Sequence, residues 1–192
     1  KTEGNLSHAV RTHEFLDELG DRREYSGEQS VSSVSTIEFD DVRFAYNEDE
    51  QVLRGISFDV TKGEFIAFVG QSGAGKSTIV SLLARMYDPD TGEIRADGTP
   101  IDEYDIEEWR ERIAVVRQQP YIFTDTLEDN VTIGNRDATR QDVEQVCEIA
   151  KVDEFVDDLP NGYESQLGDD GVRLSGGQRQ RVALARALLK DA

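Results

Sequence analysis

Apolar and polar residues alternate along two stretches in the first third of the chain. Apolar side chains occupy nearly every second position from Ile37 to Tyr46, and a second alternating run covers residues 53–60. This pattern is typical of strands with one buried face. We therefore expect two antiparallel strands joined across the acidic turn between them.

Two shorter runs are apolar throughout. Residues 65–69 read Phe-Ile-Ala-Phe-Val and end at Gly70, and residues 113–116 read Ile-Ala-Val-Val. A continuous apolar run of this length favours a strand buried on both faces, as in a parallel sheet. The helical spacing of residues 76–86 predicts a strand, a loop and a helix in succession.

Turn and cap residues mark the remaining elements. Asp97-Gly98 predicts a hairpin over residues 93–101, and Thr139 can cap a helix that ends at Ala150. Pro160 ends a short helix before it. Beyond residue 126 the pattern is mainly helical. The expected helices of this part and of the segment before it cover residues 106–112, 140–150, 153–159 and 176–190.

The first 35 residues differ in character from the rest. Residues 6–19 have near-helical apolar spacing before Gly20, and residues 21–35 are charged and then rich in serine. We expect an amphipathic helix within residues 1–20, a linker over 21–35 and one domain over 36–192. His8 and His13 lie on different faces of that helix, which favours surface histidines over a metal site.

The charge balance is strongly acidic. Asp and Glu number 40 against 21 Lys and Arg, which gives a net charge of -19, and only five residues are lysine. Such a charge repels nucleic-acid backbones on average, so no nucleic-acid partner is expected. Self-repulsion is screened at high salt, and the pattern favours a salt-loving source, a halophilic archaeon. An ordinary acidic surface is the alternative.

The single cysteine and the hydropathy bear on the redox environment of the protein and on membrane spans. Cys147 follows a helical apolar pattern, which favours a small buried side chain over chemistry and fits a reducing cytoplasm. No stretch of the sequence approaches the length of apolar residues that a membrane span needs. Any membrane anchor is therefore expected outside this chain.

A glycine-rich stretch with a phosphate-binding pattern follows the first apolar run. Gly70-Gln71-Ser72-Gly73-Ala74-Gly75-Lys76-Ser77 meets that pattern at every required position, between a predicted strand and a predicted helix. Its backbone N–H groups and the positive end of the helix can hold an anion. Lys76 is predicted to reach the β- and γ-phosphates, Ser77 to bind Mg²⁺ and Thr78 to contact a further phosphate oxygen. A glycine-rich turn without nucleotide is the alternative.

A second glycine-containing motif narrows the function. Leu174-Ser175-Gly176-Gly177-Gln178 offers an N-cap serine and two glycines that expose amides at a helix start. With this motif intact, the chain resembles the ATP-binding cassette (ABC) family over residues 36–192. The resemblance implies an α/β fold: a P-loop NTPase core, an antiparallel β subdomain and an α-helical signature subdomain.

The resemblance also assigns roles to single residues. Tyr46 matches the aromatic that stacks on adenine, with a core tyrosine as the alternative. Gln118 matches the glutamine that contacts Mg²⁺ and the attacking water, and Gln119 is the second choice. Ser175 to Gln178 would close over the ATP γ-phosphate held by a partner subunit. The implied cofactors are ATP and Mg²⁺, and the implied partner is a second cassette, arranged head to tail in a homodimer or heterodimer.

An exporter is the favoured member of the family. Gly168-Asp169-Asp170-Gly171 resembles a segment that exporters place against the membrane domain, although both central residues differ. The helix over residues 6–19 would then end a membrane domain fused N-terminally, with the cassette at the cytoplasmic face of the cell membrane. The transported substrate would be selected by membrane helices that this sequence does not contain.

The general base of the family is expected beyond this sequence. Family members carry, after the signature helix, an apolar strand ending in Asp-Glu (Walker B) and later a switch histidine, and neither follows within residues 1–192. Asp17-Glu18 has the same two residues as the Walker B pair, but it lies in a helical pattern before the phosphate loop and is not assigned that role. The C-terminally incomplete chain is thus expected to bind nucleotide weakly and to hydrolyse little alone, with Lys76 and Gln118 as its catalytic contributions.

Two other function classes remain open. A soluble cassette ATPase of DNA repair, chromosome maintenance or translation would carry both phosphate motifs. A protein that binds nucleotide without hydrolysing it, or that only pairs with a complete cassette, would also fit the missing Asp-Glu pair. Membrane spans upstream and an Asp-Glu strand downstream would distinguish these classes.

Overall fold

The computed structural model describes residues 26–47, 50–168 and 171–190. The predicted helix over residues 6–19, with His8, His13 and Asp17-Glu18, lies outside the described residues. The chain forms two compact units, one up to Ile106 and one from Glu107 onward, and each is described by itself.

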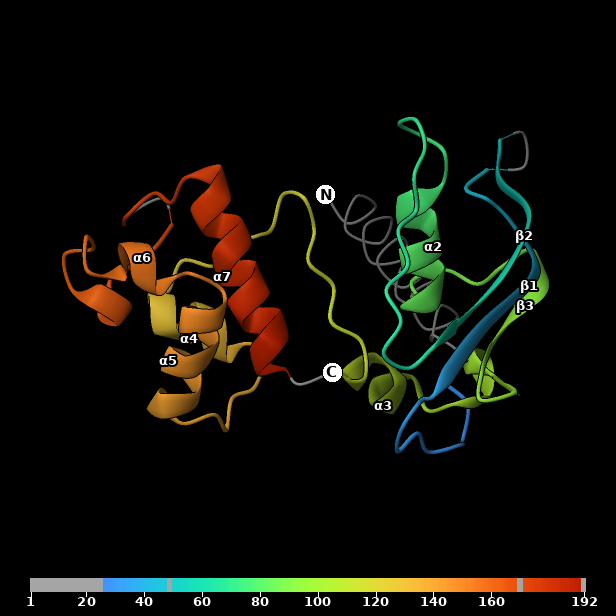
Figure 1. The fold of residues 1–192 in the computed structure, drawn as a ribbon, viewed down its shortest axis with the longest axis horizontal. Coiled ribbons are helices and arrows are strands. Elements are labelled where there is room, and N and C mark those ends of the chain that lie inside the picture. Colours follow the sequence, from blue (N-terminus) through green and yellow to red (C-terminus); the bar gives the residue numbers. More distant parts are fainter. Residues whose placement is uncertain (1–25, 48–49, 169–170, 191–192) are drawn as a thin grey trace, which may run out of the picture. The chain divides into compact units, whose positions relative to one another are not determined.

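An antiparallel sheet organises the first unit (Figure 1). Its strands are β1 (Thr36–Ala45), β2 (Gln51–Thr61), β3 (Thr91–Ala96) and β4 (Thr99–Pro100), in the order β2-β1-β3-β4. All neighbouring strands are antiparallel. The predicted pair of antiparallel strands is thereby confirmed. Its alternating apolar side chains Phe39, Val42, Phe44 and Leu53, together with Ile94 of β3, supply much of this unit's core.

The predicted hairpin turn has the backbone that its sequence requires. Asp97 and Gly98 have φ values of 49° and 82°, so both central residues of the two-residue loop are left-handed, as in the turn that Asp-Gly favours. The Asp97 carboxylate accepts hydrogen bonds from the backbone N–H groups of Ser35 and Thr36. These bonds, that from Ser35 first, lower the pKa of Asp97.

The end of the predicted linker is tied to this unit. Gln29 forms a parallel bridge with Tyr104. The backbone N–H of Gly27 donates to the Tyr104 carbonyl at 3.1 Å, and that of Asp105 donates to the Gln29 carbonyl at 2.8 Å. Residues 26–29 therefore run beside residues 103–105, next to the short helix η1 (Ile101–Glu103).

Helix α2 (Lys76–Leu83) ends earlier than the predicted residue 86. The N–H of Met86 donates to the carbonyl of Ser81 and that of Arg85 to the carbonyl of Leu82, both at 2.9 Å. Arg85 has a φ of 51°. This bonding pattern is a Schellman motif, which usually places glycine at the left-handed position. Periodicity did not reveal the stop, because an arginine occupies that position.

The two predicted buried strands are wrong for this structure. Residues 65–69 and 113–116 have no strand geometry, and Phe65 and Val69 are each 94% exposed. Strands of a parallel sheet are stable only between hydrogen-bonded neighbours. Neither segment pairs with any strand among the described residues. An apolar pattern alone is therefore not sufficient to make these segments strands.

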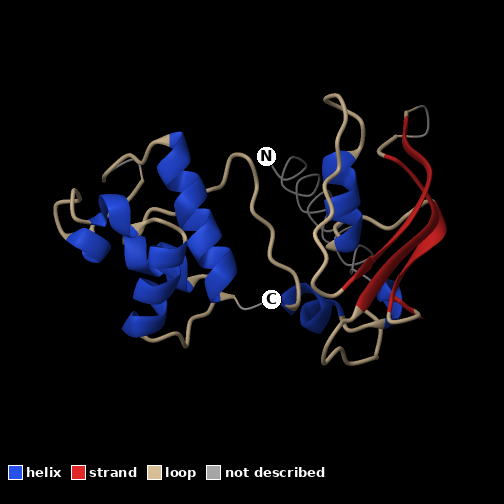
Figure 2. Ribbon diagram, viewed as in Figure 1, coloured by secondary structure: helices blue, strands red, loops and turns tan. Residues whose placement is uncertain are grey.

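The second unit consists of helices and loops over its described residues (Figure 2). Its helices are α4 (Leu127–Thr132), α5 (Arg140–Ile149), α6 (Asp153–Val156), the short η2 (Gly162–Glu164) and α7 (Gly176–Leu189), while α3 (Ile106–Glu111) spans the boundary with the first unit. The four helices expected from the sequence are therefore present, with slightly different ends.

One apolar cluster holds α4, α5, α6 and α7 together. Its fully buried members include Leu127, Val131, Val143, Val152 and Val182. Cys147 belongs to it with no exposed surface, which confirms the predicted buried role, and burial raises the pKa of its thiol to about 11. No helix among the described residues has the length and apolar character that a membrane crossing requires.

Candidate nucleotide-binding site

The glycine-rich loop leads directly into α2, as its sequence predicts. Gly73 and Gly75 have φ values of 83° and 84°, a left-handed conformation that glycine adopts without strain. A Cβ on Gly75 would come within 2.6 Å of Leu53 Cδ2. Gly75 therefore lets the backbone turn into the helix while lying against β2.

The start of α2 is left open for an anion. No side chain caps it and its first turn carries no acidic residue. In contrast, the side chains of Thr126, Thr139 and Ser175 cap α4, α5 and α7. The first N–H groups of a helix need a partner, and the helix dipole favours a negative one. In a chain of net charge -19, a helix start without a carboxylate is suited to phosphate.

The ammonium of Lys76 bridges the loop. Lys76 Nζ donates to the Gly70 carbonyl at 2.9 Å and to the Gln71 carbonyl at 2.7 Å. These bonds fold the side chain over the loop and hold a positive charge beside the open helix start. The Ser77 side chain next to it is exposed, whereas Thr78 is buried.

Tyr46 lies just past the end of β1 and reaches the same helix. Its hydroxyl is 3.1 Å from the Thr78 hydroxyl, and its ring packs edge-on with Phe44 and Tyr87. Tyr46 is 48% exposed. It is therefore not a core tyrosine, and part of its ring is open to a flat ligand. The contact with Thr78 was not predicted from the sequence.

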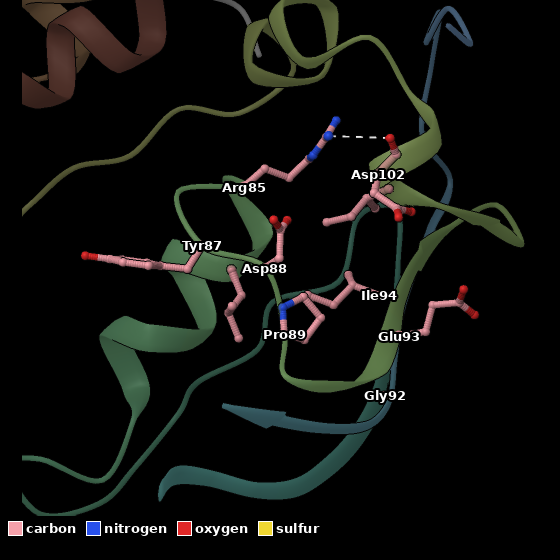
Figure 3. Close-up of a pocket in the computed structure, with 10 residues that line it drawn as sticks. Arg85, Tyr87, Asp88, Pro89, Gly92, Glu93, Ile94 and Asp102 are labelled. Carbon is pink, nitrogen blue, oxygen red and sulfur yellow. Dashed lines mark hydrogen bonds between the residues drawn. The ribbon is translucent and has the colours of Figure 1, made fainter. Parts of the chain in front are cut away.

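A separate pocket of about 370 Å³ lies beyond α2 and does not suit a phosphate (Figure 3). Its lining includes the acidic residues Asp88, Glu93 and Asp102, of which Glu93 points its side chain away from the pocket. Its one arginine, Arg85, is turned towards the main chain and donates to the carbonyls of Tyr104 at 2.8 Å and Asp102 at 3.4 Å. Carboxylates repel phosphate oxygens, so the phosphate loop is the better nucleotide site.

The second motif begins α7 with a capping box. The Ser175 hydroxyl accepts from the N–H of Gln178 at 3.3 Å, and the Gln178 side chain accepts from the N–H of Ser175 at 2.8 Å. The predicted N-cap is confirmed. Gly176 and Gly177 are exposed, and a Cβ on Gly177 would meet no atom within 4 Å. The surface over the first turn of α7 is therefore open.

Gln118 lies beside this second motif. Its backbone carbonyl accepts from Gln180 Nε2 on α7 at 3.1 Å, and Gln118 and Gly177 line one shallow hollow. Gln119 is also exposed, and nothing in its geometry favours it over Gln118. The structure thus places Gln118 next to the signature residues of its own unit, and its contact with Mg²⁺ and the attacking water stays a prediction.

Two further side chains, those of Arg186 on α7 and of Lys190 at its C-cap, hold main chain on both sides of Gln118. Arg186 donates to the Tyr121 carbonyl at 3.2 Å and to the Asn130 carbonyl at 2.8 Å. Lys190 Nζ donates to the carbonyls of Arg110 at 2.7 Å and Ile113 at 2.8 Å. Gln180, Arg186 and Lys190 therefore fasten residues 110–130 to α7 through main-chain oxygens. Sequence reasoning missed these five contacts.

Asn130 completes this attachment from inside. It has no exposed surface. Its side chain accepts from the N–H of Phe123 at 2.8 Å and donates to the carbonyls of Phe123 at 3.0 Å and Thr126 at 2.9 Å. Arg186 donates to its Oδ1 at 3.2 Å. This buried asparagine therefore fixes the turn between the Gln118 segment and α4.

The segment around Gly168 and Gly171 is packed tightly on the same unit. A Cβ on Gly168 would lie 2.8 Å from Thr124 Oγ1, and one on Gly171 would lie 2.3 Å from the Gln166 carbonyl. The two aspartates between them lie outside the described residues. Both glycines are therefore required by close contacts of this segment with its own unit.

The predicted site residues are divided between the two units. Tyr46 and residues 70–78 belong to the first, and Gln118 with residues 175–178 belongs to the second. Among the described residues no cluster of three or more His, Cys, Asp and Glu side chains could hold a metal ion. The two predicted Mg²⁺ ligands, Ser77 and Gln118, belong to different units, and both offer oxygen atoms, the ligand type that Mg²⁺ prefers.

Known proteins resemble this chain in sequence and in fold. The family model "ABC transporter" matches residues 53–192. The ATP-dependent lipid A-core flippase of Chromohalobacter salexigens is 50% identical over 157 residues, 81% of this chain and 27% of the flippase. P-glycoprotein 14 of Caenorhabditis elegans is 40% identical over 187 residues, 95% of this chain and 14% of that protein.

A solved structure adds the fold. A bacterial Atm1-family ABC exporter with ATP bound matches with a TM-score of 0.88 and 35% identity, over 97% of this chain and 33% of the exporter chain. This agrees with the fold class expected from the sequence. The chain thus spans 14% to 33% of the length of the three proteins compared.

Proposed function

Because this chain belongs to the ABC transporter family, we propose that it is the ATP-binding domain of an exporter, which hydrolyses ATP to drive transport across a membrane. The observation that carries the proposal is the open start of α2: it has no side-chain cap and no acidic residue in its first turn, and Lys76 lies across the loop before it. These groups fit a triphosphate.

Each site residue has a physical role in this proposal. The amides of residues 70–78 and the Lys76 ammonium bind the β- and γ-phosphates, and Tyr46 stacks on adenine. The Ser77 hydroxyl and the Gln118 side chain hold Mg²⁺, which neutralises phosphate charge when bound. Gln118 also orients the attacking water. The remaining loop residues Gln71, Ser72 and Ala74 shape the cradle.

A second ABC domain completes the site in this proposal. The start of α7, from Ser175 to Gln178, presents exposed amides to the γ-phosphate bound by that partner, and the partner's signature does the same for Lys76. Two sites form when the domains meet head to tail, as a homodimer or a heterodimer. The exposed glycines at the start of α7 support this arrangement, because a phosphate can approach their backbone closely.

We further propose that membrane helices fused N-terminally carry the substrate and that the ATPase domain lies on the cytoplasmic side. Support comes from the flippase and P-glycoprotein relatives and from the Gly168–Gly171 segment. In this proposal the general base is the glutamate of an Asp-Glu (Walker B) pair, which the sequence of residues 176–192 does not contain. Sequencing the native transcript in both directions tests this: a stop codon directly after Ala192 would contradict the hydrolytic role.

Substitution of Lys76 tests the nucleotide site directly. Lys76→Ala should abolish ATP binding by the complete protein, because it removes the charge beside the phosphates. Lys62→Ala is the matched control: it removes the same charge from an exposed turn of the same unit and should leave the affinity unchanged. Equilibrium ATP titration of both variants provides the measurement. Unchanged affinity in Lys76→Ala would refute the phosphate-loop assignment.

The acidic composition supports a second, environmental proposal. We propose that the protein works at molar salt in a halophilic archaeon, where screening shortens the Debye length to roughly 3 Å. The proposal rests on the net charge of -19, since the relatives above are bacterial and animal. The melting temperature should fall when salt is lowered from molar to about 0.1 M, where the Debye length is about 10 Å. Equal melting temperatures at both salts would contradict it.

A further inference from the structure

The proposed base platform is bonded to the phosphate loop. Tyr46 Oη lies 3.1 Å from Thr78 Oγ1, although the two residues are 32 positions apart. Thr78 is on the first turn of α2 and is only 2% exposed. The contact thus joins the end of β1 to the helix that begins at the phosphates.

Aromatic neighbours restrict the Tyr46 ring as well. The ring centroid of Phe44 is 4.9 Å away at an interplanar angle of 88°, and that of Tyr87 is 5.3 Å away at 87°. Edge-to-face pairs of this kind are favourable arrangements. Tyr46 still keeps 48% of its surface exposed. The ring is therefore held by its neighbours and by its hydroxyl while part of it remains open.

We propose that the Tyr46–Thr78 hydrogen bond sets the orientation of the base-stacking ring relative to the phosphate loop. This inference rests on the nucleotide-binding function proposed above. A ring that could rotate freely would have to be ordered when adenine binds, and this ordering would weaken affinity. The hydrogen bond orders the ring beforehand. Tyr46 is then a positioning residue in addition to a stacking surface.

Thr78 is suited to link the two parts of the ligand. A hydroxyl group can accept one hydrogen bond and donate another. When Tyr46 donates to Thr78 Oγ1, the Thr78 proton remains available for a phosphate oxygen. The base and phosphate subsites would then share one hydrogen-bonded chain, and losing the Tyr46 hydroxyl would affect ligands that carry a base more than ligands that do not.

The test compares two ligands in the complete protein. Tyr46→Phe keeps the ring and removes the hydroxyl, so it should weaken binding of the non-hydrolysable analogue adenylyl imidodiphosphate by about 2- to 10-fold, the range expected for one hydrogen bond. Binding of inorganic tripolyphosphate should not change. Tyr87→Phe is the matched control: Tyr87 is equally exposed, at 48%, and its hydroxyl bonds to none of the described residues. It should leave both affinities unchanged.

A double-mutant cycle tests the partner. Thr78→Val removes the hydroxyl with little change of shape, and in that background Tyr46→Phe should have no further effect on analogue binding. In a Thr78→Ser background, which keeps the hydroxyl, Tyr46→Phe should still weaken it. The second background also keeps the test valid if Thr78→Val does not fold.

Three results would overturn the inference. Tyr46→Phe could leave analogue affinity unchanged, or it could weaken analogue and tripolyphosphate equally, which would indicate general damage to the fold. It could also weaken the analogue equally in the Val and Ser backgrounds. If Lys76→Ala abolishes binding while Tyr46→Phe is neutral, only this inference fails. If the unsubstituted protein binds no nucleotide, the proposed function fails with it.

Discussion

Two capping boxes of nearly identical geometry allow the structural and functional roles of the signature serine to be separated. Ser175 caps α7 and Thr139 caps α5. In both boxes the cap hydroxyl accepts a hydrogen bond from the backbone N–H three residues later, that of Gln178 or Asp142, at 3.3 Å. The side chain of Gln178 or Asp142 in turn accepts from the backbone N–H of the cap residue at 2.8 Å. Replacing either cap by alanine should cost about 1 kcal/mol of stability, within a range of about 0.5–2 kcal/mol.

Thr139→Ala should be at least as destabilised as Ser175→Ala, because the Thr139 hydroxyl also bonds the Asp142 carboxylate. The two variants should nevertheless differ in activity in the opposite sense. A loss of 1 kcal/mol lowers the melting temperature by about 2–4 °C for a domain of this size. Ser175→Ala should also remove a hydrogen bond to the γ-phosphate held by the partner. Such charge-assisted bonds contribute about 1.5–3 kcal/mol, so kcat/KM for ATP should fall about 10- to 100-fold. Thr139→Ala should keep its ATPase activity.

The stability of Thr139→Ala and Ser175→Ala at low pH provides an independent check on the two capping boxes. The Thr139 hydroxyl donates to the Asp142 carboxylate at 2.6 Å and lowers the pKa of Asp142. A group whose pKa is lowered by folding stabilises above its unfolded pKa, about 3.9 for aspartate, and loses this contribution as pH falls through the folded value. The stability deficit of Thr139→Ala should shrink below that pH. The deficit of Ser175→Ala should persist, because Gln178 does not titrate.

The assays are thermal unfolding followed by circular dichroism, and steady-state ATPase of the complete protein. Thr139→Ala losing as much activity as Ser175→Ala would refute the reasoning, because the activity loss would then follow from stability. Full activity of Ser175→Ala would refute the proposed phosphate contact of the signature.

Two further predictions concern the loop and the buried asparagine. Gly75→Ala and Gly73→Ala both force a left-handed alanine, which costs about 1–2 kcal/mol, but only the new methyl group at position 75 also collides with Leu53. Gly75→Ala should therefore lose more ATP affinity and more thermal stability than Gly73→Ala in ATP titration and thermal unfolding. Equal losses in the two variants would contradict the close packing. Asn130→Ala should lower the free energy of unfolding by about 2–4 kcal/mol, because it leaves main-chain groups of Phe123 unpaired. A loss below about 1 kcal/mol in urea unfolding would contradict the role of the Asn130 hydrogen bonds in holding this turn.

Local signals were sufficient for much of this fold. The caps Thr139 and Ser175 and the turn Asp97-Gly98 act within a few residues, so the sequence alone predicts them. Residues 65–69 were wrongly predicted because strand formation depends on neighbours distant in sequence. Arg85 was missed because the left-handed position after a helix usually holds glycine.

In the candidate site, too, features that are local in sequence were predicted and contacts between distant residues were not. The two phosphate motifs are continuous in sequence, and therefore their backbone geometry could be predicted with their residues. The contacts between Tyr46 and Thr78 and between Arg186 and Asn130 join residues 32 and 56 positions apart. No periodicity or motif reports such pairs, and only the folded chain identifies them.

The attachment of residues 110–130 to α7 has a consequence for variation between related proteins. Gln180, Arg186 and Lys190 donate mostly to main-chain carbonyls, which every amino acid possesses. Side chains at Gln118, Tyr121 and Ile113 can therefore change without removing these bonds. The donors on α7 have no such freedom. Substitutions should thus be tolerated along the held segment apart from Gln118 and Asn130, and this segment can acquire new surface contacts, while Gln180, Arg186 and Lys190 remain constrained.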